Sequence, residues 1–183
     1  ILKTVEIDNE GINIEELEAL CRKTKIKAVY VTPHHQFPTT IPMKAGRRIQ
    51  LLELSLKYHF AIIEDDYDHE YHFGAGNNLA LASSEKSANV IYISSLSKLI
   101  APAIRVGYVT GPATFMESLV NLRVQIDRQG DTILEHAIAE LMEDGTIKRH
   151  ARKVVAIYKE RRDLMEVCLH ENFGNAISFN KPT

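Results

Sequence analysis

The most constraining feature of this sequence is a short apolar run, Phe60-Ala61-Ile62-Ile63, that leads directly into the acidic cluster Glu64-Asp65-Asp66. Four apolar residues without polar alternation are typical of a strand that is buried on both faces, as in a parallel sheet covered by helices. Three neighbouring carboxylates repel one another and need a cation nearby. The run therefore predicts a buried parallel strand that ends in a cluster of carboxylates.

Other strand-like runs alternate with helical patterns along the chain. Further strands are predicted at 27–32, 89–94 and 105–109, and amphipathic spacing predicts helices at 14–23, 47–59, 113–127, 132–144 and 146–170. This alternation indicates an α/β domain with a mostly parallel sheet and flanking helices. The strand near residue 105 follows the strand ending at Ser94 too closely for a crossover helix. We therefore expect that pair to be antiparallel and the sheet to be mixed.

A lysine stands just beyond one predicted strand, in the segment Ser94-Ser95-Leu96-Ser97-Lys98. A lysine that forms a Schiff base must lie at a strand end, partly desolvated, so that its amine can be neutral and nucleophilic. The neighbouring hydroxyls and Arg105 could hold a phosphate, because arginine binds phosphate bidentately. On this motif alone, a surface loop with a solvated lysine and an ordinary ion pair at Arg105 explains the residues equally well.

The acidic cluster at 64–66 leaves three interpretations open when it is taken alone. A carboxylate there could pair with the protonated ring nitrogen of a pyridoxal phosphate (PLP) cofactor. It could instead belong to a metal site, or it could be a capped strand end that faces solvent. The eight histidines favour no metal site: His34 and His35 are adjacent and would point to opposite faces of a strand, and neither HxxxH nor CxxC occurs. We therefore predict no metal ligands.

Three segments taken together resemble the aminotransferase class I/II family of fold-type-I PLP proteins. Their motifs are most similar to the PLP domain of MocR-type transcription regulators, a branch of the GntR regulators. That branch shows T-P-x-H-Q-F-P-T-G, then I-E-D-D-Y-D-x-E, then S-K-x-x-x-P-x-x-R-x-G-Y. The matching segments here are Thr32–Thr40, Ile63–Tyr71 and Leu96–Tyr108, and the similarity covers nearly the whole chain.

The resemblance implies a role for each matching residue. Lys98 is expected to form the internal aldimine with PLP, Asp65 to pair with the pyridine nitrogen, and Tyr67 to hydrogen-bond the phenolic oxygen of the ring. The phosphate is expected to be held by three further residues: Ser95, Ser97 and Arg105. Structural roles are expected for Asp66, Asp68 and Glu70.

Two departures from the family pattern stand out. Transaminases usually carry Asn before the Pro of their N-P-x-G loop, where it contacts the ring oxygen, and Phe37 stands there instead. Either Gln36 or His35 could take over that contact. Thr40 replaces the usual Gly, so we expect the loop to differ locally.

The resemblance also sets an expectation for domain organisation. The chain starts at Ile1 rather than Met, and we expect residues 1–183 to be the central part of the PLP-binding large domain, with the N-terminal and C-terminal parts of a longer protein absent. The family's phosphate-cradling turn, its ring-stacking aromatic residue and its substrate-binding arginine would lie outside this segment. We therefore expect the segment to be inactive by itself.

Two functions follow from the resemblance. The first is an aminotransferase-like effector domain of a MocR/GntR-type transcriptional regulator, which senses an amino compound through aldimine formation at Lys98. The second is a free-standing aminotransferase acting on an amino acid. A PLP fold retained only for dimerisation is a third class.

Partners and location are expected on the same grounds. The resemblance implies a cytoplasmic homodimer with an amino acid or amine ligand, and DNA contact only through an N-terminal domain outside these residues. The net charge of −2 gives the chain itself no basic character, and no apolar run approaches the roughly 20 residues of a membrane span.

Overall fold

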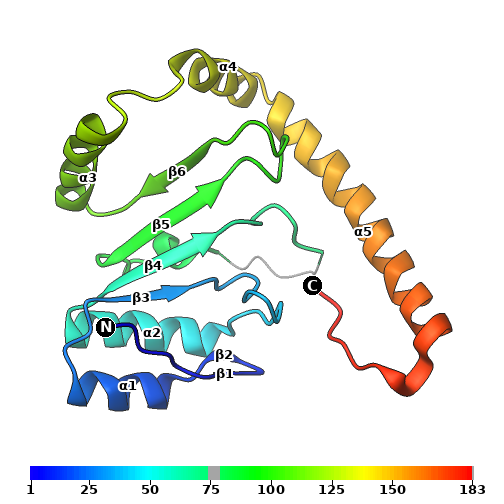
Figure 1. Ribbon diagram of the computed structural model, residues 1–183, viewed down its shortest axis with the longest axis horizontal. Helices are drawn as coiled ribbons and strands as arrows, with labels where there is room; N and C mark the ends of the chain where they lie inside the picture. Colours follow the sequence, from blue (N-terminus) through cyan, green and yellow to red (C-terminus); the bar gives the residue numbers. More distant parts are fainter. Residues whose placement is uncertain (74–78, 183) are drawn as a thin grey trace.

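The computed structural model describes residues 1–73 and 79–182 (Figure 1). Residues 74–78 of the predicted loop 74–87 lie outside the described residues. In chain order the elements are β1 (Ile7–Asp8), β2 (Gly11–Ile12), α1 (Ile14–Lys23), β3 (Ala28–Val31), α2 (Ala45–Tyr58), β4 (Ala61–Asp66), the 3₁₀ turn η1 (Leu81–Ser83), β5 (Val90–Ser95), β6 (Gly107–Thr110), α3 (Ala113–Ile126), α4 (Thr132–Glu143), α5 (Thr146–Phe173) and the 3₁₀ turn η2 (Gly174–Ala176).

Four strands form the central sheet, in the order β3-β4-β5-β6 (Figure 1). β3, β4 and β5 are parallel, and β6 is antiparallel to β5. The predicted mixed, mostly parallel α/β sheet is therefore confirmed. β6 begins at Gly107 rather than at the predicted residue 105, because Arg105 adopts a left-handed backbone with φ 52°. Gly107 packs so closely on β5 that a Cβ there would lie 2.7 Å from the Ser94 carbonyl oxygen.

The main hydrophobic core lies between the sheet and helices α1 and α2. Leu17 from α1, Leu51 from α2 and Ile62 from β4 are each at most 1% exposed. Burial alternates along β4, so Ile62 faces this core while Ile63 on the opposite face is only half-buried. The prediction that this strand is buried on both faces is therefore wrong among the described residues, because the helices cover mainly one face.

The acidic cluster is part of strand β4 rather than a group beyond its end. The alternation of the strand points Glu64 and Asp66 to the buried face and Asp65 to the other, which separates the three charges. Glu64 accepts backbone N–H bonds from Leu81 and Ala82 at 2.7 and 2.9 Å. Burial raises the pKa of Glu64, and these two bonds act against that rise. Separate donors, rather than one shared cation, stabilise the cluster.

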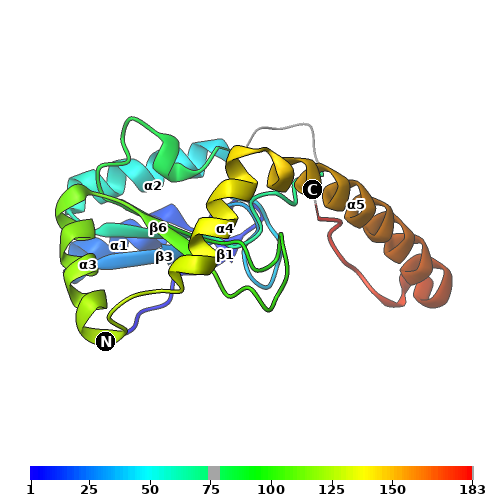
Figure 2. The same ribbon diagram turned by 90° about the horizontal axis from the view of Figure 1, so that it is seen from above.

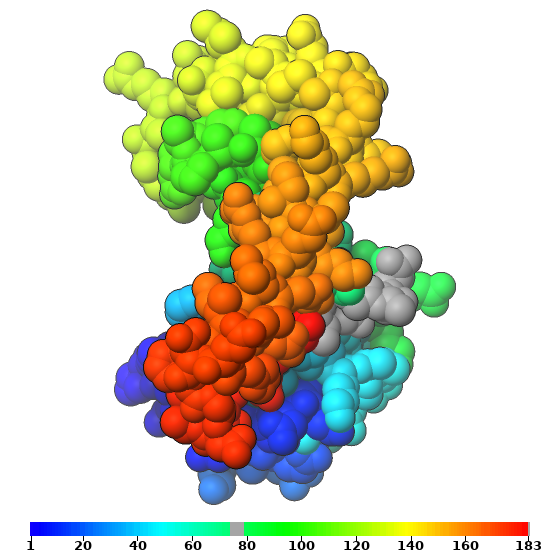
Figure 3. All heavy atoms as spheres, turned by 90° about the vertical axis from the view of Figure 1, so that its right-hand side faces the viewer, coloured from blue at the N-terminus to red at the C-terminus, as the bar shows by residue number. Residues whose placement is uncertain are grey.

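The three C-terminal helices surround one edge of the sheet and have much less core. α4 contributes Ile138 and α5 contributes Ile147 to a small cluster with Leu96 and Leu99. α5 continues for 28 residues, extending past the end of the sheet (Figure 2) and along the surface toward the N-terminal segments (Figure 3). Within the described ranges, no helix is both long and apolar enough to cross a membrane.

Candidate functional site

The predicted Schiff-base lysine lies three residues beyond β5, next to the segment that follows β4. The Lys98 Nζ stands 3.9 Å from the centroid of the Tyr67 ring, a cation–π contact. The Lys98 carbonyl oxygen accepts a hydrogen bond from the Tyr71 hydroxyl at 2.8 Å, which holds the backbone of the two segments together. The side chain of Lys98 itself is exposed. The structure thus brings together Lys98 and Tyr67, two of the residues that the resemblance singles out.

Asp65 reaches the same side of the sheet through the alternation of β4. Its Oδ2 accepts a 2.6 Å hydrogen bond from the hydroxyl of Tyr30 on the neighbouring strand β3. Burial and this bond raise the pKa of Tyr30 to about 12, so the phenol stays protonated and donates. Sequence reasoning missed Tyr30. The available signal was the alternation of side chains along the strand. Val29 and Val31 are buried on one face, so Tyr30 between them must point to the other face.

Tyr67 connects this arrangement to the loop after β3. Its hydroxyl donates to the His35 carbonyl oxygen at 3.0 Å. Burial, followed by the charges of Asp68 and Asp65, raises the pKa of Tyr67 to about 12. The imidazole of His35 is bonded to Asp68, with 2.9 Å between Nδ1 and Oδ2. Tyr67 is therefore a neutral donor that is positioned from two neighbouring loops.

The expected phosphate residues are close in the chain but only partly brought together. Ser95 ends β5, and its Oγ accepts the Ser97 backbone N–H at 3.2 Å. Arg105 is exposed, and the structure shows no hydrogen bond between its side chain and either serine in the described parts of the chain. The predicted residues fit a cofactor with a basic ring nitrogen and an anionic phosphate, because Asp65 supplies a carboxylate for the nitrogen and the serines and Arg105 supply donors for the phosphate.

The loop after β3 is held by a buried arginine. The Arg48 guanidinium donates to the carbonyl oxygens of Met43, Leu79 and Pro33 at 2.9, 2.7 and 3.0 Å. Burial lowers the pKa of Arg48. These three bonds fix both ends of the loop and hold it beside the segment before η1.

The two departures in this loop have clear structural outcomes. Thr40 has φ 61°, a left-handed conformation that generally favours Gly, and its N–H donates to the Gln36 carbonyl oxygen at 2.7 Å. Such a conformation costs a residue with a Cβ about 1–2 kcal/mol. The Phe37 side chain is 71% exposed. Whether Gln36 or His35 contacts a cofactor stays a prediction.

A group of polar rings lies on the opposite face of β4, around Asp66. The Asp66 carboxylate is bonded to the Nδ1 atoms of His34 and His69, each at 2.8 Å, and accepts from the Tyr92 hydroxyl at 2.7 Å. Burial alone would raise the pKa of Asp66, but the bonds from His34 and His69 reverse this and lower it. The hydrogen bond to Asp66 in turn raises the pKa of His69. The structure therefore supports the structural role expected for Asp66.

His72 completes this group, which the sequence pattern did not predict. Burial and the neighbouring imidazoles lower the pKa of His72 to about 4, so its ring is neutral at neutral pH. One ring nitrogen from each of His34, His69 and His72 lies within 4.8 Å of the others. The missed signal was topological, because His34 follows β3 and the other two follow β4, and adjacent parallel strands end at the same edge.

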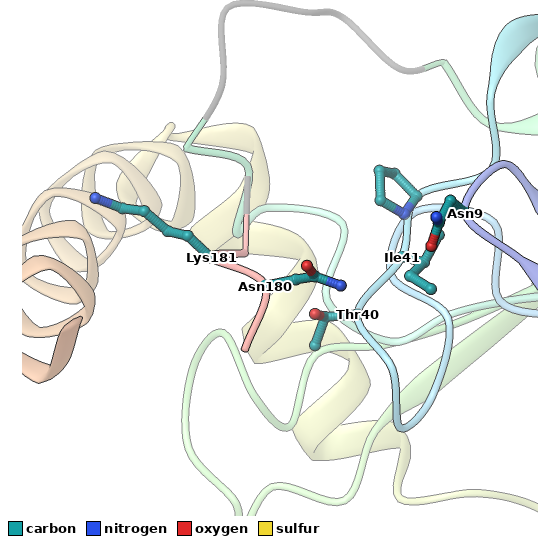
Figure 4. A pocket seen from close by; sticks show the side chains of 6 residues that line it. Asn9, Thr40, Ile41, Asn180 and Lys181 are labelled. Carbon is teal, nitrogen blue, oxygen red and sulfur yellow. The ribbon is translucent and has the colours of Figure 1, made fainter. Parts of the chain in front are cut away.

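Two hollows lie near the site. A groove of about 920 Å³ runs along β3, and its lining includes Tyr30, Gln36 and Ile63, on the same face as Asp65. A smaller one of about 260 Å³ separates the loop after β3 from the C-terminal tail, with Thr40 and Asn180 facing each other across it (Figure 4). Asp65, Tyr67 and Lys98 line neither hollow, and Tyr30, which donates to Asp65, is the residue that the groove along β3 shares with the site.

Comparison with known proteins decides the family. Residues 2–179 match the model of the family described as aminotransferase class I and II. The chain belongs to this family. The chain is also 29% identical to aromatic-amino-acid aminotransferase 1 of Thermococcus litoralis, over 97% of this chain and 44% of that protein. It is 30% identical to the uncharacterized HTH-type transcriptional regulator YdfD of Bacillus subtilis, over 99% of this chain and 38% of that protein.

Solved structures agree with the family assignment. The kynurenine aminotransferase of Pyrococcus horikoshii, solved in complex with PMP, superposes with a TM-score of 0.90 at 27% identity, covering 97% of this chain and 45% of that one. The chain thus spans less than half the length of these aminotransferase and regulator relatives. Its fold is that of part of a PLP aminotransferase.

Proposed function

We propose that this chain is the PLP-binding part of an effector domain in a MocR/GntR-type transcriptional regulator, in which Lys98 binds the cofactor covalently and an amino compound is sensed. The observation that carries the proposal is the position of the Lys98 Nζ, 3.9 Å from the Tyr67 ring centroid. Asp65 lies near the end of β4 and Tyr67 directly follows that strand. Together with Lys98, they place an ammonium, a carboxylate and a phenol at one edge of the sheet. PLP, when bound, supplies an electron-withdrawing ring.

The residues of this chain have distinct tasks in the proposal. Asp65, oriented by the Tyr30 hydroxyl, would hold the protonated ring nitrogen by charge. Tyr67 keeps its proton and would donate to the ring oxygen. The phosphate would be held by Ser95, Ser97 and Arg105. Lys98 can also accept and return a proton next to the attached ligand.

A regulator is favoured over a free-standing aminotransferase by the motifs of Thr32–Thr40 and Ile63–Tyr71, which have the MocR-type pattern. The aminotransferase alternative is supported by the similarity to the Thermococcus and Pyrococcus enzymes. In the regulator, DNA is bound through a separate helix-turn-helix domain, and the protein is a cytoplasmic homodimer. In the alternative, the same lysine serves transamination of an amino acid.

The cofactor proposal is tested with the full-length protein. PLP is titrated into wild type, Lys98→Ala and the control Lys148→Ala, which alters an exposed lysine on α5. Absorbance is recorded from about 300 to 500 nm, the range in which the bound cofactor absorbs. We expect a cofactor band near the visible edge for wild type and the control, and its loss in Lys98→Ala. An unchanged spectrum in Lys98→Ala would contradict the proposal.

A second measurement separates the two functions. Amino acids are added to the PLP-loaded protein together with a 2-oxo acid acceptor, and amino-group transfer is followed by product analysis. For a sensing domain we expect a spectral change without sustained turnover. Continuous formation of the new amino acid would favour the aminotransferase.

A further inference from the structure

We propose that His34, His69 and His72 form a binding site for one divalent transition-metal ion of the zinc type. The site lies on the buried face of β4, opposite the face of Asp65, and is separate from the proposed PLP residues. One ring nitrogen from each histidine lies within 4.8 Å of the other two. A Zn–N bond is about 2.0–2.1 Å, so one ion can reach three nitrogens at such separations with small side-chain adjustments.

The rings are arranged around a shared space rather than stacked in a column. The centroids of His34 and His72 are 4.7 Å apart, and those of His34 and His69 are 5.2 Å apart. All three ring pairs meet edge to face, with interplanar angles of 61° to 83°. Nitrogen atoms at ring edges can therefore converge on one point, as metal coordination requires.

Asp66 supplies the outer support that histidine ligands commonly have. Its two carboxylate oxygens are bonded to the Nδ1 atoms of His34 and His69, each at 2.8 Å. A metal-binding histidine usually donates its second ring N–H to a carboxylate, which fixes the tautomer and directs the other nitrogen to the ion. Asp66 holds two of the three histidines in this way, and its side chain is fully buried.

His72 provides the observation that points to a ligand. Its Nε2 is buried, and it has no hydrogen-bond partner among the described residues. A buried polar atom without a partner destabilises the folded chain. Coordination of an ion by this nitrogen would remove that destabilisation. His69, whose side chain is 43% exposed, leaves the cluster open to an ion from solvent.

The chemistry of the donors selects the class of ion. Imidazole nitrogens suit zinc, copper, nickel and iron, whereas calcium and magnesium require oxygen ligands. Three histidines leave a fourth tetrahedral position for water or another ligand. The proposed ion would tie the loop after β3 to the segment after β4.

The test uses full-length, tag-free protein that has been stripped with a chelator. Zn²⁺ alone is titrated in competition with a chromophoric chelator, and bound zinc is counted by mass spectrometry. We compare wild type with the double variant His69→Asn/His72→Asn, which spares the buried His34. The matched control is His59→Asn/His136→Asn, because both of these histidines are exposed and lie outside the cluster. Circular dichroism verifies that each variant is folded.

We expect one zinc ion per chain in wild type and control, and at least about 100-fold weaker binding in the double variant, beyond the 10–100-fold typical of losing an outer partner alone. Zinc should also raise the melting temperature of wild type but not of the double variant. Absence of zinc binding to wild type, or equal binding by the two double variants, would overturn the proposal. Lys98→Ala should retain zinc, so this result is independent of the PLP proposal.

Discussion

The sheet region and the C-terminal helices are built on different principles. The sheet with α1 and α2 encloses a core of thirteen buried apolar residues, whereas the C-terminal cluster has four. α3 has no buried residue, and the 28-residue α5 has only Ile147. Both α3 and α5 leave large apolar side chains exposed, including Ile126 at 74% and Leu164 at 63%. Packing within the described chain therefore explains the sheet, but not why these helices are so apolar.

The difference also separates the site from its surroundings. Asp65, Tyr67 and Lys98 depend on the strands and on the loops that the core supports. The C-terminal helices contribute indirectly. For example, the Nε2 atom of His150 on α5 lies 3.0 Å from the carbonyl oxygen of Leu99, the residue after Lys98. We therefore expect mutations in the two regions to differ in both size and kind of effect.

The largest effect is expected from Phe60→Ala, because Phe60 is 1% exposed in the main core. Loss of its contacts should lower the free energy of unfolding by about 3–5 kcal/mol. Ile138→Ala, in the small C-terminal cluster, should cost about 2 kcal/mol, at the low end for such truncations. Urea unfolding of the full-length protein measures both. Equal losses would show that the two regions are equally well packed.

A smaller and more specific effect is expected from Tyr30→Phe. The change removes the 2.6 Å hydrogen bond to Asp65 but keeps the ring. Since one such bond contributes about 1 kcal/mol, PLP affinity should fall about fivefold with little loss of stability. A PLP titration measures this, with Tyr158→Phe on α5 as the control. Unchanged PLP affinity in Tyr30→Phe would mean that Asp65 does not need this bond.

The smallest effect is expected from Leu164→Ala on α5. This side chain is 63% exposed, so its truncation should change the free energy of unfolding by less than about 0.5 kcal/mol. The same urea measurement applies, now at low and high protein concentration. A loss of several kcal/mol would show that this face of α5 is covered in the full-length protein.

Much of the fold could be predicted from local patterns. The four strands of the central sheet, the five helices and the reversed direction of β6 follow from periodicity and chain spacing, which are properties of neighbouring residues, whereas the short strands β1 and β2 were not predicted. The meeting of Lys98 with Tyr67 also follows, because β4 and β5 are adjacent and end at the same edge. The strand 105–109 was placed two residues early because the left-handed backbone of Arg105 leaves no trace in hydrophobic spacing.

The rest required knowledge of which loops meet in space. The acidic cluster looked like one repelling group, but each carboxylate has its own donors, with Glu64 and Asp66 on the buried face of β4 and Asp65 on the other. The contact between His34 and His72 joins residues from two loops, so no spacing motif could encode it. Likewise, Tyr30 became a site residue only when strand order placed β3 beside β4. These are consequences of tertiary arrangement rather than of local sequence.

Strand β4 places two chemically identical groups side by side, and only its register tells them apart. A slip of one residue against β3 and β5 would turn Asp66 toward Tyr30 and Asp65 toward the histidines, because each step along a strand reverses the face. Inserting or deleting a single residue within β4 before Asp65 would therefore exchange the faces on which the two carboxylates lie. The proposed PLP residues and the histidine cluster would then both lose their carboxylate partner, even though every side chain that they require would still be present.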